Sequence, residues 1–461
     1  MKLGFFASTD LITNHPDEDL FWSLIEKSTD YPDSISVPLL VIGGWFDHFP
    51  DDVLRSFDDL RTRSDVKVRS EHKLMMGPWL HTGIDKANQG ELDYSNAAGA
   101  ANDRALQFFA YYLQGAKNGY PLLAPVQYYQ MGTNEWRTTN DWHALANSSL
   151  TFYLQTKGEM NSSPPIQTKS YDSLLYDPRN PSPAVGGARF NPFDKTIPIG
   201  PVDIRQEVES RSDALVFSTD PLSSDLLLDG PVSVELFVSS DRTDTDFSAR
   251  LCDVYPDGRS MIMTQGIRRA RFRNAYDKEE LMIPGQMYRI IIGLQNIGLT
   301  LLKNHRLRIV ISSSDYPHYD INLNNGGALY KAGDTLVAAN YVYHEAAHPS
   351  HIVLSTFSTV RVDEPPASEP QTISLYQNNP NPCMFNTTFR FRINGNMYEF
   401  SKVKLRVVDL LGREVALLLE KELSPGEYAI PFDTGTLRNG VYFYQLTARN
   451  NTLIKSMMVI K

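Results

Sequence analysis

The chain lacks features that define several whole classes of protein. No run of 18 apolar residues occurs, so no segment is long enough to span a bilayer as a helix. The two cysteines, Cys252 and Cys383, cannot form a disulfide framework and fall in different expected domains. A net charge of −10 argues against nucleic acid or anionic lipid as the main partner. What remains is a globular protein, long enough at 461 residues for two or more domains.

A further absence concerns catalysis. Two motifs, Gly43-Gly44-Trp45-Phe46-Asp47 and Gly77-Pro78-Trp79-Leu80-His81, each follow an apolar, strand-like run. An acid and an imidazole at the ends of neighbouring strands are the second and third members of a Ser–Asp–His triad in α/β-hydrolases. The chain contains no Gly-x-Ser-x-Gly motif for the nucleophile. The sequence therefore predicts the acid and the base of a triad without its serine.

The region around these motifs has the pattern of a βαβ unit. The continuous apolar run 37–42 predicts a strand buried on both faces, and residues 66–76 predict a second strand. Pro50-Asp51-Asp52 favours the start of a helix between them, so the two strands should pair in parallel. A later helix over 103–114 should end at Gly115 and bury one apolar face, formed by Leu106, Phe109 and Leu113.

From about residue 120 the hydrophobic period changes to two. Short strands separated by Gly, Pro, Asn and Asp predict a β-sandwich of jelly-roll type over 120–362. The Pro- and Glu-rich segment 363–373 is typical of a linker. Residues 374–461 predict a smaller, immunoglobulin-like β-sandwich. The predicted fold class is thus an α/β domain followed by two β-sandwiches.

Two clusters of polar residues in the first sandwich have simple structural interpretations. His344, His348 and His351 lack a cysteine at ligand spacing, and Glu345 is the one carboxylate there, so we expect a turn and a strand edge and no metal site. The basic run of Arg268, Arg269, Arg271 and Arg273 predicts a solvated strand face paired with nearby acidic residues.

The first 360 residues resemble the family of X-Pro dipeptidyl-peptidases, cocaine esterase and α-amino-acid ester hydrolases. The resemblance rests on motifs in family order, at residues 37–47, 77–81, 126–132 with Trp136, 176–178, 244–247 and 322–326. It implies an α/β-hydrolase domain with a helical cap, followed by a jelly roll that forms part of the active-site wall. Residues 1–119 would then be the C-terminal part of the hydrolase domain with a remnant of the cap.

The same resemblance implies roles for individual residues. By motif match Asp47 is the triad acid and His81 the general base of a serine hydrolase that forms an acyl-enzyme without a cofactor. Phe49 matches the residue that lines the acyl pocket in cocaine esterase, with core packing as its alternative role. Phe49 and Pro50 stand where α-amino-acid ester hydrolases carry acidic residues, which disfavours that activity. The implied substrate is a small ester or a short peptide.

Residues 374–461 resemble the C-terminal sorting domain of type IX (Por) secretion cargo. The motifs lie at 375–382, 408–415 and 440–442. They imply type IX machinery as a partner and a secreted or cell-surface protein.

Type IX cargo needs a signal peptide, and the hydrolase needs a serine. We expect both to lie upstream of Met1, so that this chain is a fragment that is inactive alone. The alternative is a non-catalytic secreted surface protein whose β-sandwich binds glycan or peptide. A nucleophile motif upstream would distinguish the two.

Overall fold

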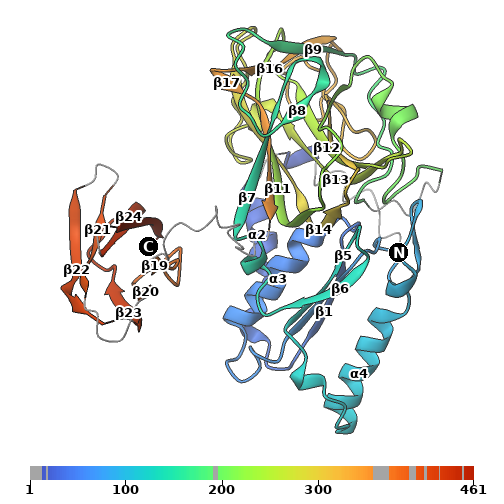
Figure 1. The fold of residues 1–461 in the computed structure, drawn as a ribbon. Helices are drawn as coiled ribbons and strands as arrows, with labels where there is room; N and C mark the ends of the chain where they lie inside the picture. The colour runs from blue at the N-terminus through green and yellow to red at the C-terminus, as the bar shows by residue number, and fades with distance from the viewer. Residues whose placement is uncertain are drawn as a thin grey trace. The chain divides into compact units, whose positions relative to one another are not determined.

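The computed structural model describes residues 13–16, 19–189, 196–356, 373–393, 401–409, 413–424, 426–448 and 451–460. The chain forms two compact units, Met1–Thr359 and Val360–Lys461 (Figure 1). The predicted linker lies outside the described residues except for Ile373, which begins a strand. Within the described ranges, no helix combines the length and the apolar character needed to cross a membrane.

The N-terminal part of the first unit contains a mixed four-stranded sheet in the order β1-β2-β5-β6. Its strands are β1 (Leu40–Gly44), β2 (Lys73–Gly77), β5 (Val126–Gln130) and β6 (Glu135–Thr139). The parallel pairing of β1 with β2 confirms the predicted βαβ unit, β5 adds in parallel and β6 antiparallel. Among the described residues, the helices beside the sheet include α2 (Leu20–Thr29), α3 (Pro50–Arg63) and α4 (Ala100–Gln114) (Figure 1).

Helix α3, the crossover between β1 and β2, follows from its sequence. Pro50 occupies the first helical turn, where its missing N–H costs nothing, and acidic residues follow it there. Asp51 and Asp52 near the N-terminus, with Arg61 and Arg63 in the last turn, complement the helix dipole. The spacing of Val53, Phe57 and Leu60 predicts one apolar face for this helix; Phe57 and Leu60 are buried together with Leu54, and Val53 is partly buried against the same core.

Two predicted boundaries and one predicted face are wrong. Residues 66–71 form turns rather than the start of β2, because charged and exposed residues interrupt the apolar run there. β1 begins at Leu40 rather than 37, since Pro38 has no N–H to donate. Helix α4 ends at the left-handed Gly115 as predicted, but its predicted face is exposed. The rings of Phe108 and Tyr112, which pack on Tyr120, face the protein instead of Leu106, Phe109 and Leu113.

The sandwich of the first unit is built from two larger sheets. One has the order β10-β15-β12-β13, with β10 (Leu215–Ser218), β12 (Asp246–Val254), β13 (Ser260–Arg269) and β15 (Arg306–Ser312). The other sheet has eight strands. Six of them follow the order β17-β16-β11-β18-β7-β8, while β14 pairs with β11 and β9 pairs with β16. Its strands are β7 (Ser148–Leu154), β8 (Met160–Asn161), β9 (Tyr171–Tyr176), β11 (Leu226–Ser240), β14 (Tyr288–Leu301), β16 (Ala338–Glu345), β17 (His348–Pro349) and β18 (His351–Thr356). A two-stranded hairpin, β3 (Asn88–Gln89) and β4 (Leu92–Asp93), lies before α4.

The domain boundary predicted at residue 119 lies between α4 and β5, at a point where the mixed sheet is not yet complete. Strands β5 and β6 have the alternating pattern of the sandwich, yet they pair with β2 in the mixed sheet. One apolar core nevertheless joins both parts and includes Trp45, Phe46, Leu236 and Ile292. The two parts therefore form one continuous body around the strand ends of the mixed sheet.

The second unit is an antiparallel β-sandwich. Its described strands form a three-stranded sheet, β19-β20-β23, and a four-stranded sheet, β22-β21-β24-β25. Their bounds are β19 (Ile373–Leu375), β20 (Asn386–Ile393), β21 (Ser401–Val408), β22 (Glu414–Leu423), β23 (Gly426–Asp433), β24 (Gly440–Ala448) and β25 (Asn451–Val459). Phe389, Phe391 and Tyr444 lie in the core between these sheets.

Candidate active site

Glycines at the ends of β1 and β2 let the two following loops approach each other. A Cβ atom on Gly44 would lie 2.1 Å from the carbonyl oxygen of Trp79, so only glycine fits there. The close approach allows the amides of Trp45 and Phe46 to donate to the carbonyls of Gly77 and Trp79, at 2.9 and 3.1 Å. These bonds hold the two loops together, so that Asp47, which follows Phe46, lies beside His81, which follows Leu80.

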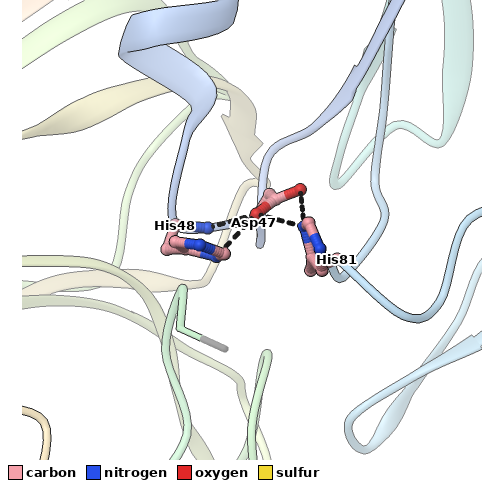
Figure 2. Close-up of side chains that lie close together, drawn as sticks. All are labelled: Asp47, His48 and His81. Atoms are coloured by element: carbon pink, nitrogen blue, oxygen red, sulfur yellow. Dashed lines mark hydrogen bonds and ion pairs between the residues drawn. The ribbon is translucent and has the colours of Figure 1, made fainter. Parts of the chain in front are cut away.

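Asp47 and His81 form a hydrogen-bonded pair (Figure 2). Nδ1 of His81 donates to the carboxylate, at 3.0 Å from Oδ2 and 3.2 Å from Oδ1. The Asp47 residue is 7 % exposed, whereas the His81 side chain is 39 % exposed. A buried acid therefore orients an imidazole that can meet an incoming molecule, which is the arrangement of the acid and base in a triad.

The loop that carries His81 is fixed by a buried amide that sequence analysis did not identify. Gln89 is fully buried, and its Oε1 accepts from the backbone N–H of Leu80 at 2.8 Å. Its Nε2 donates to the carbonyls of Gly83 and Lys86, each at 2.8 Å. Nothing in the sequence around Gln89 distinguishes it from a surface residue of a turn.

A second imidazole, also not identified from the sequence, lies beside the pair (Figure 2). The backbone N–H of His48 donates to Oδ1 of Asp47 at 2.6 Å, and Nδ1 of His48 lies 2.9 Å from the same oxygen. Burial lowers the pKa of His48, and the nearby carboxylate of Asp47 opposes this effect. At neutral pH this imidazole is therefore mainly uncharged.

Phe49 lies beside the candidate base. Its residue is 42 % exposed, and its ring packs against His48 at an interplanar angle of 44°, with centroids 3.6 Å apart. The edge-on contact with His81 has a centroid distance of 5.9 Å. This exposure does not fit the core-packing alternative, and it leaves the ring accessible next to the imidazole.

The three side chains also offer donor atoms for a metal ion. One atom from each of Asp47, His48 and His81 lies within 4.8 Å of the others, and catalytic zinc sites commonly use three such ligands. However, Nδ1 of His81 already donates to the carboxylate, so metal binding through that atom would require this hydrogen bond to break. The described geometry suits an acid–base pair better than a metal centre.

The histidines of the sandwich do not form a common site. Nε2 of His344 lies 3.0 Å from Asp172, Nδ1 of His348 lies 2.7 Å from Glu345, and Nδ1 of His351 donates to the carbonyl of Pro349. Each imidazole thus has its own partner on a strand or a turn.

Strand β14 of the sandwich contacts the backbone next to the Asp47–His81 pair. Nε2 of Gln295 donates to the carbonyl of His48 at 3.3 Å. The backbone and side-chain amides of Asn296 both donate to Oδ1 of Asp51, each at 2.8 Å. Gln295 and Asp51 line a cavity of about 720 Å³, a size typical of small-molecule sites.

Comparison with protein families divides the chain into three matches. The S15 family of X-Pro dipeptidyl-peptidases matches residues 6–83, which include both motifs with Asp47 and His81. The C-terminal non-catalytic domain of X-Pro dipeptidyl-peptidases matches residues 118–353, more than half of the chain. A secretion-system C-terminal sorting domain matches residues 379–461.

Individual proteins and structures agree with these matches. Cocaine esterase from Rhodococcus sp. (strain MB1 Bresler) is 33 % identical over 363 residues, which cover 75 % of this chain and 60 % of the esterase. An α-amino acid ester hydrolase is 25 % identical with a TM-score of 0.64, over 77 % of this chain and 61 % of the other. An aminopeptidase from the marine sediment archaeon Thaumarchaeota archaeon has the same fold, with 24 % identity, a TM-score of 0.67 and coverage of 77 % and 60 %.

The chain thus spans about 60 % of the length of these relatives. Their fold is an α/β-hydrolase followed by a C-terminal β domain, which corresponds to the mixed sheet and the sandwich of the first unit. On these grounds the chain belongs to the X-Pro dipeptidyl-peptidase family, together with cocaine esterase and the α-amino-acid ester hydrolases, and it carries a secretion sorting domain at its C-terminal end.

Proposed function

We propose that this chain is part of a serine hydrolase that cleaves ester, amide or peptide bonds through an acyl-enzyme. The observation that carries the proposal is the hydrogen bond from Nδ1 of His81 to the buried carboxylate of Asp47 at the ends of two parallel strands. In this chemistry His81 takes the proton of a serine hydroxyl and later returns it to the leaving group. Asp47 holds the imidazole in the required tautomer and stabilises its cation.

The nucleophilic serine, in this proposal, comes from polypeptide outside these 461 residues. Two facts support it: the chain contains no Gly-x-Ser-x-Gly motif, and it spans about 60 % of its relatives. The oxyanion hole needs an amide next to that serine, so it would be supplied by the same polypeptide. The 461 residues alone are therefore expected to be inactive.

The acyl pocket would include Phe49. Its exposed ring stands edge-on to His81, where it would contact the acyl group of a bound substrate. A small ester or a short peptide would fit, since cocaine esterase is among the relatives and the S15 family comprises X-Pro dipeptidyl-peptidases.

The test begins with the DNA directly upstream of the Met1 codon. The longest in-frame product is expressed and assayed with 4-nitrophenyl acetate and with a fluorophosphonate probe, which labels activated serines. We expect labelling of an upstream serine, and a decrease in kcat of about 10⁴-fold for Asp47→Asn. The matched control is His143→Gln, which removes an imidazole 2.6 Å from Asp58 in an exposed pair elsewhere on this unit.

Two results would overturn the proposal. One is the absence of a serine elbow from every upstream frame, in which case the non-catalytic alternative gains support. The other is an active product whose kcat is unchanged in Asp47→Asn.

We also propose that the protein is exported by a type IX system and acts at the cell surface or beyond it. The sorting-domain match over residues 379–461 supports this localisation. Deletion of residues 374–461 from the protein expressed in its own host should leave the hydrolase inside the cell, as measured by immunoblotting of cell and medium fractions.

A further inference from the structure

The arginine run of the sandwich pairs with acidic residues as its sequence predicts, but it does not form the predicted solvated strand face. Three of its members are paired and largely withdrawn from solvent. Arg269 binds Asp246 at 2.9 Å, and Arg271 binds Asp244 at 2.8 Å. The side chains of Arg271 and Arg273 are only 3 % and 8 % exposed. These arginines therefore form ion pairs within the sandwich rather than a charged surface.

Arg268 differs from the other three. No carboxylate of the described residues lies within 4.0 Å of its guanidinium. Its Nε and Nη1 are buried and have no hydrogen-bond partner in the described part of the chain. The guanidinium carbon lies 4.1 Å from the centre of the Tyr276 ring. This cation–π contact holds the guanidinium over the ring but uses none of its N–H donors.

Arg268 lines the cavity that reaches Gln295 and Asp51 next to the candidate catalytic pair. Apolar side chains also contribute to its wall, among them Ile267, Phe272 and Leu294. Arg268 is partly buried, and two buried N–H donors without acceptors are costly, so their presence in a cavity wall favours a ligand that supplies the missing acceptors. The natural acceptor for a planar guanidinium is a carboxylate.

The acidic residues of the same cavity are already engaged. Asp246 is bound by Arg269, and Asp51 accepts two hydrogen bonds from Asn296. Asp320 lies against Tyr330, whose pKa is raised by burial and by this carboxylate. None of these carboxylates pairs with Arg268, whose buried Nε and Nη1 keep their N–H donors unused among the described residues.

We propose that Arg268, positioned over the ring of Tyr276, binds the carboxylate of the molecule that occupies this cavity, and that the apolar body of this molecule contacts Ile267, Phe272 and Leu294. Insofar as that molecule is the substrate, the inference rests on the proposed hydrolase function. Substrates would then carry a free carboxylate away from the bond that is cleaved, as a short peptide or the half-ester of a diacid does.

The test measures binding rather than turnover, so it needs no nucleophile. Isothermal titration calorimetry compares 4-phenylbutyrate with 4-phenylbutyramide on the 461-residue chain at pH 7.5 and 50 mM salt. We expect the acid to bind the wild-type chain at least about tenfold more tightly than the amide, as charge-assisted hydrogen bonds are stronger than neutral ones. Arg268→Met, which keeps a long stem without charge, should abolish that preference, and Arg268→Lys should restore part of it.

The matched control is Arg259→Met. Arg259 also stacks on a tyrosine, with its guanidinium carbon 4.8 Å from the Tyr255 ring, but it is paired with Asp257 and does not line the cavity. This variant should keep the preference for the acid. Tryptophan fluorescence and thermal unfolding check that each variant is folded.

Three results would overturn the proposal: no detectable binding of the acid, equal affinities for acid and amide, or a preference that survives in Arg268→Met. None of them bears on Asp47 or His81. Conversely, an inactive Asp47→Asn enzyme with an intact preference for the acid would support both proposals independently.

Discussion

A buried carboxyl group in the long strand β11 should make the first unit less stable as the pH rises. Asp229 is 1 % exposed, and neither of its carboxyl oxygens accepts a hydrogen bond of ordinary geometry from the described residues. Burial raises the pKa of Asp229 to about 7, although the charge of Arg137 works against the rise. Replacement of Asp229 by asparagine removes the ionisation and keeps the shape of the side chain.

The direction and the size of this change in the free energy of unfolding follow from proton linkage. Between the ordinary aspartate pKa of 3.8 and the raised value of about 7, the native state retains a proton that the unfolded state has released. The stabilisation from this proton is fully present below pH 3.8 and is lost as the pH rises through about 7. A difference of about three pKa units corresponds to roughly 4 kcal/mol. Relative to wild type, Asp229→Asn should therefore gain up to about 4 kcal/mol between about pH 4 and pH 8.

Urea unfolding followed by tryptophan fluorescence measures this change. All five tryptophans, at positions 22, 45, 79, 136 and 142, lie in the unit Met1–Thr359, so the signal reports the unit that contains Asp229. Asp220→Asn is the control, because that side chain is fully exposed. If the free energies of unfolding of wild type and Asp229→Asn change in parallel from pH 4 to pH 8, Asp229 does not have the raised pKa from which the prediction is made.

Two further predictions concern the candidate site. Gly44→Ala should destabilise the first unit by about 1–3 kcal/mol, since its Cβ would meet the Trp79 carbonyl at 2.1 Å. Gly293→Ala is the control, because a Cβ there has nothing within 4 Å, and its effect should be close to neutral. Urea unfolding measures the free energy of unfolding of both variants. The imidazole of His48 should titrate below the ordinary value of 6.5, chiefly because of burial. An NMR titration of its ring protons tests this, and a midpoint above 6.5 would contradict the described environment.

The position of the candidate pair was predictable from the sequence because it depends on local order. Two apolar strands joined by one crossover helix pair in parallel, and the residues after parallel strands meet at the same edge of the sheet. The motifs that end in Asp47 and His81 thus imply their proximity once the strands are recognised. The glycines in both motifs are explained by the backbone contacts that the loops make there.

Other features depend on contacts that no local pattern encodes. Gln295 reaches the carbonyl of His48 from 247 positions away, and a glutamine in an alternating strand has no sequence signal for such a role. The apolar face of α4 was predicted from spacing alone, but aromatic contacts with Tyr120 decide which face is buried. The sequence does not show that Arg268 lacks a carboxylate partner, because the structure alone shows which of the four neighbouring arginines form ion pairs.

The same distant contacts explain how a cavity wall in the sandwich can be held in place beside the mixed sheet. Strand β14 binds the backbone of His48 through Gln295, and the start of α3 through Asn296. Strand β13, which carries Arg268, approaches β14 so closely that a Cβ on Gly266 would lie 2.2 Å from the carbonyl of Gly293. Arg268 is therefore connected to the loop of Asp47 through the close approach of β13 to β14 and the hydrogen bond from the Gln295 side chain to the His48 carbonyl. Gly266 itself lines the cavity, and a side chain there would meet the carbonyl of Gly293. A substitution at Gly266 should therefore alter the preference for the carboxylate probe by displacing β13 from β14.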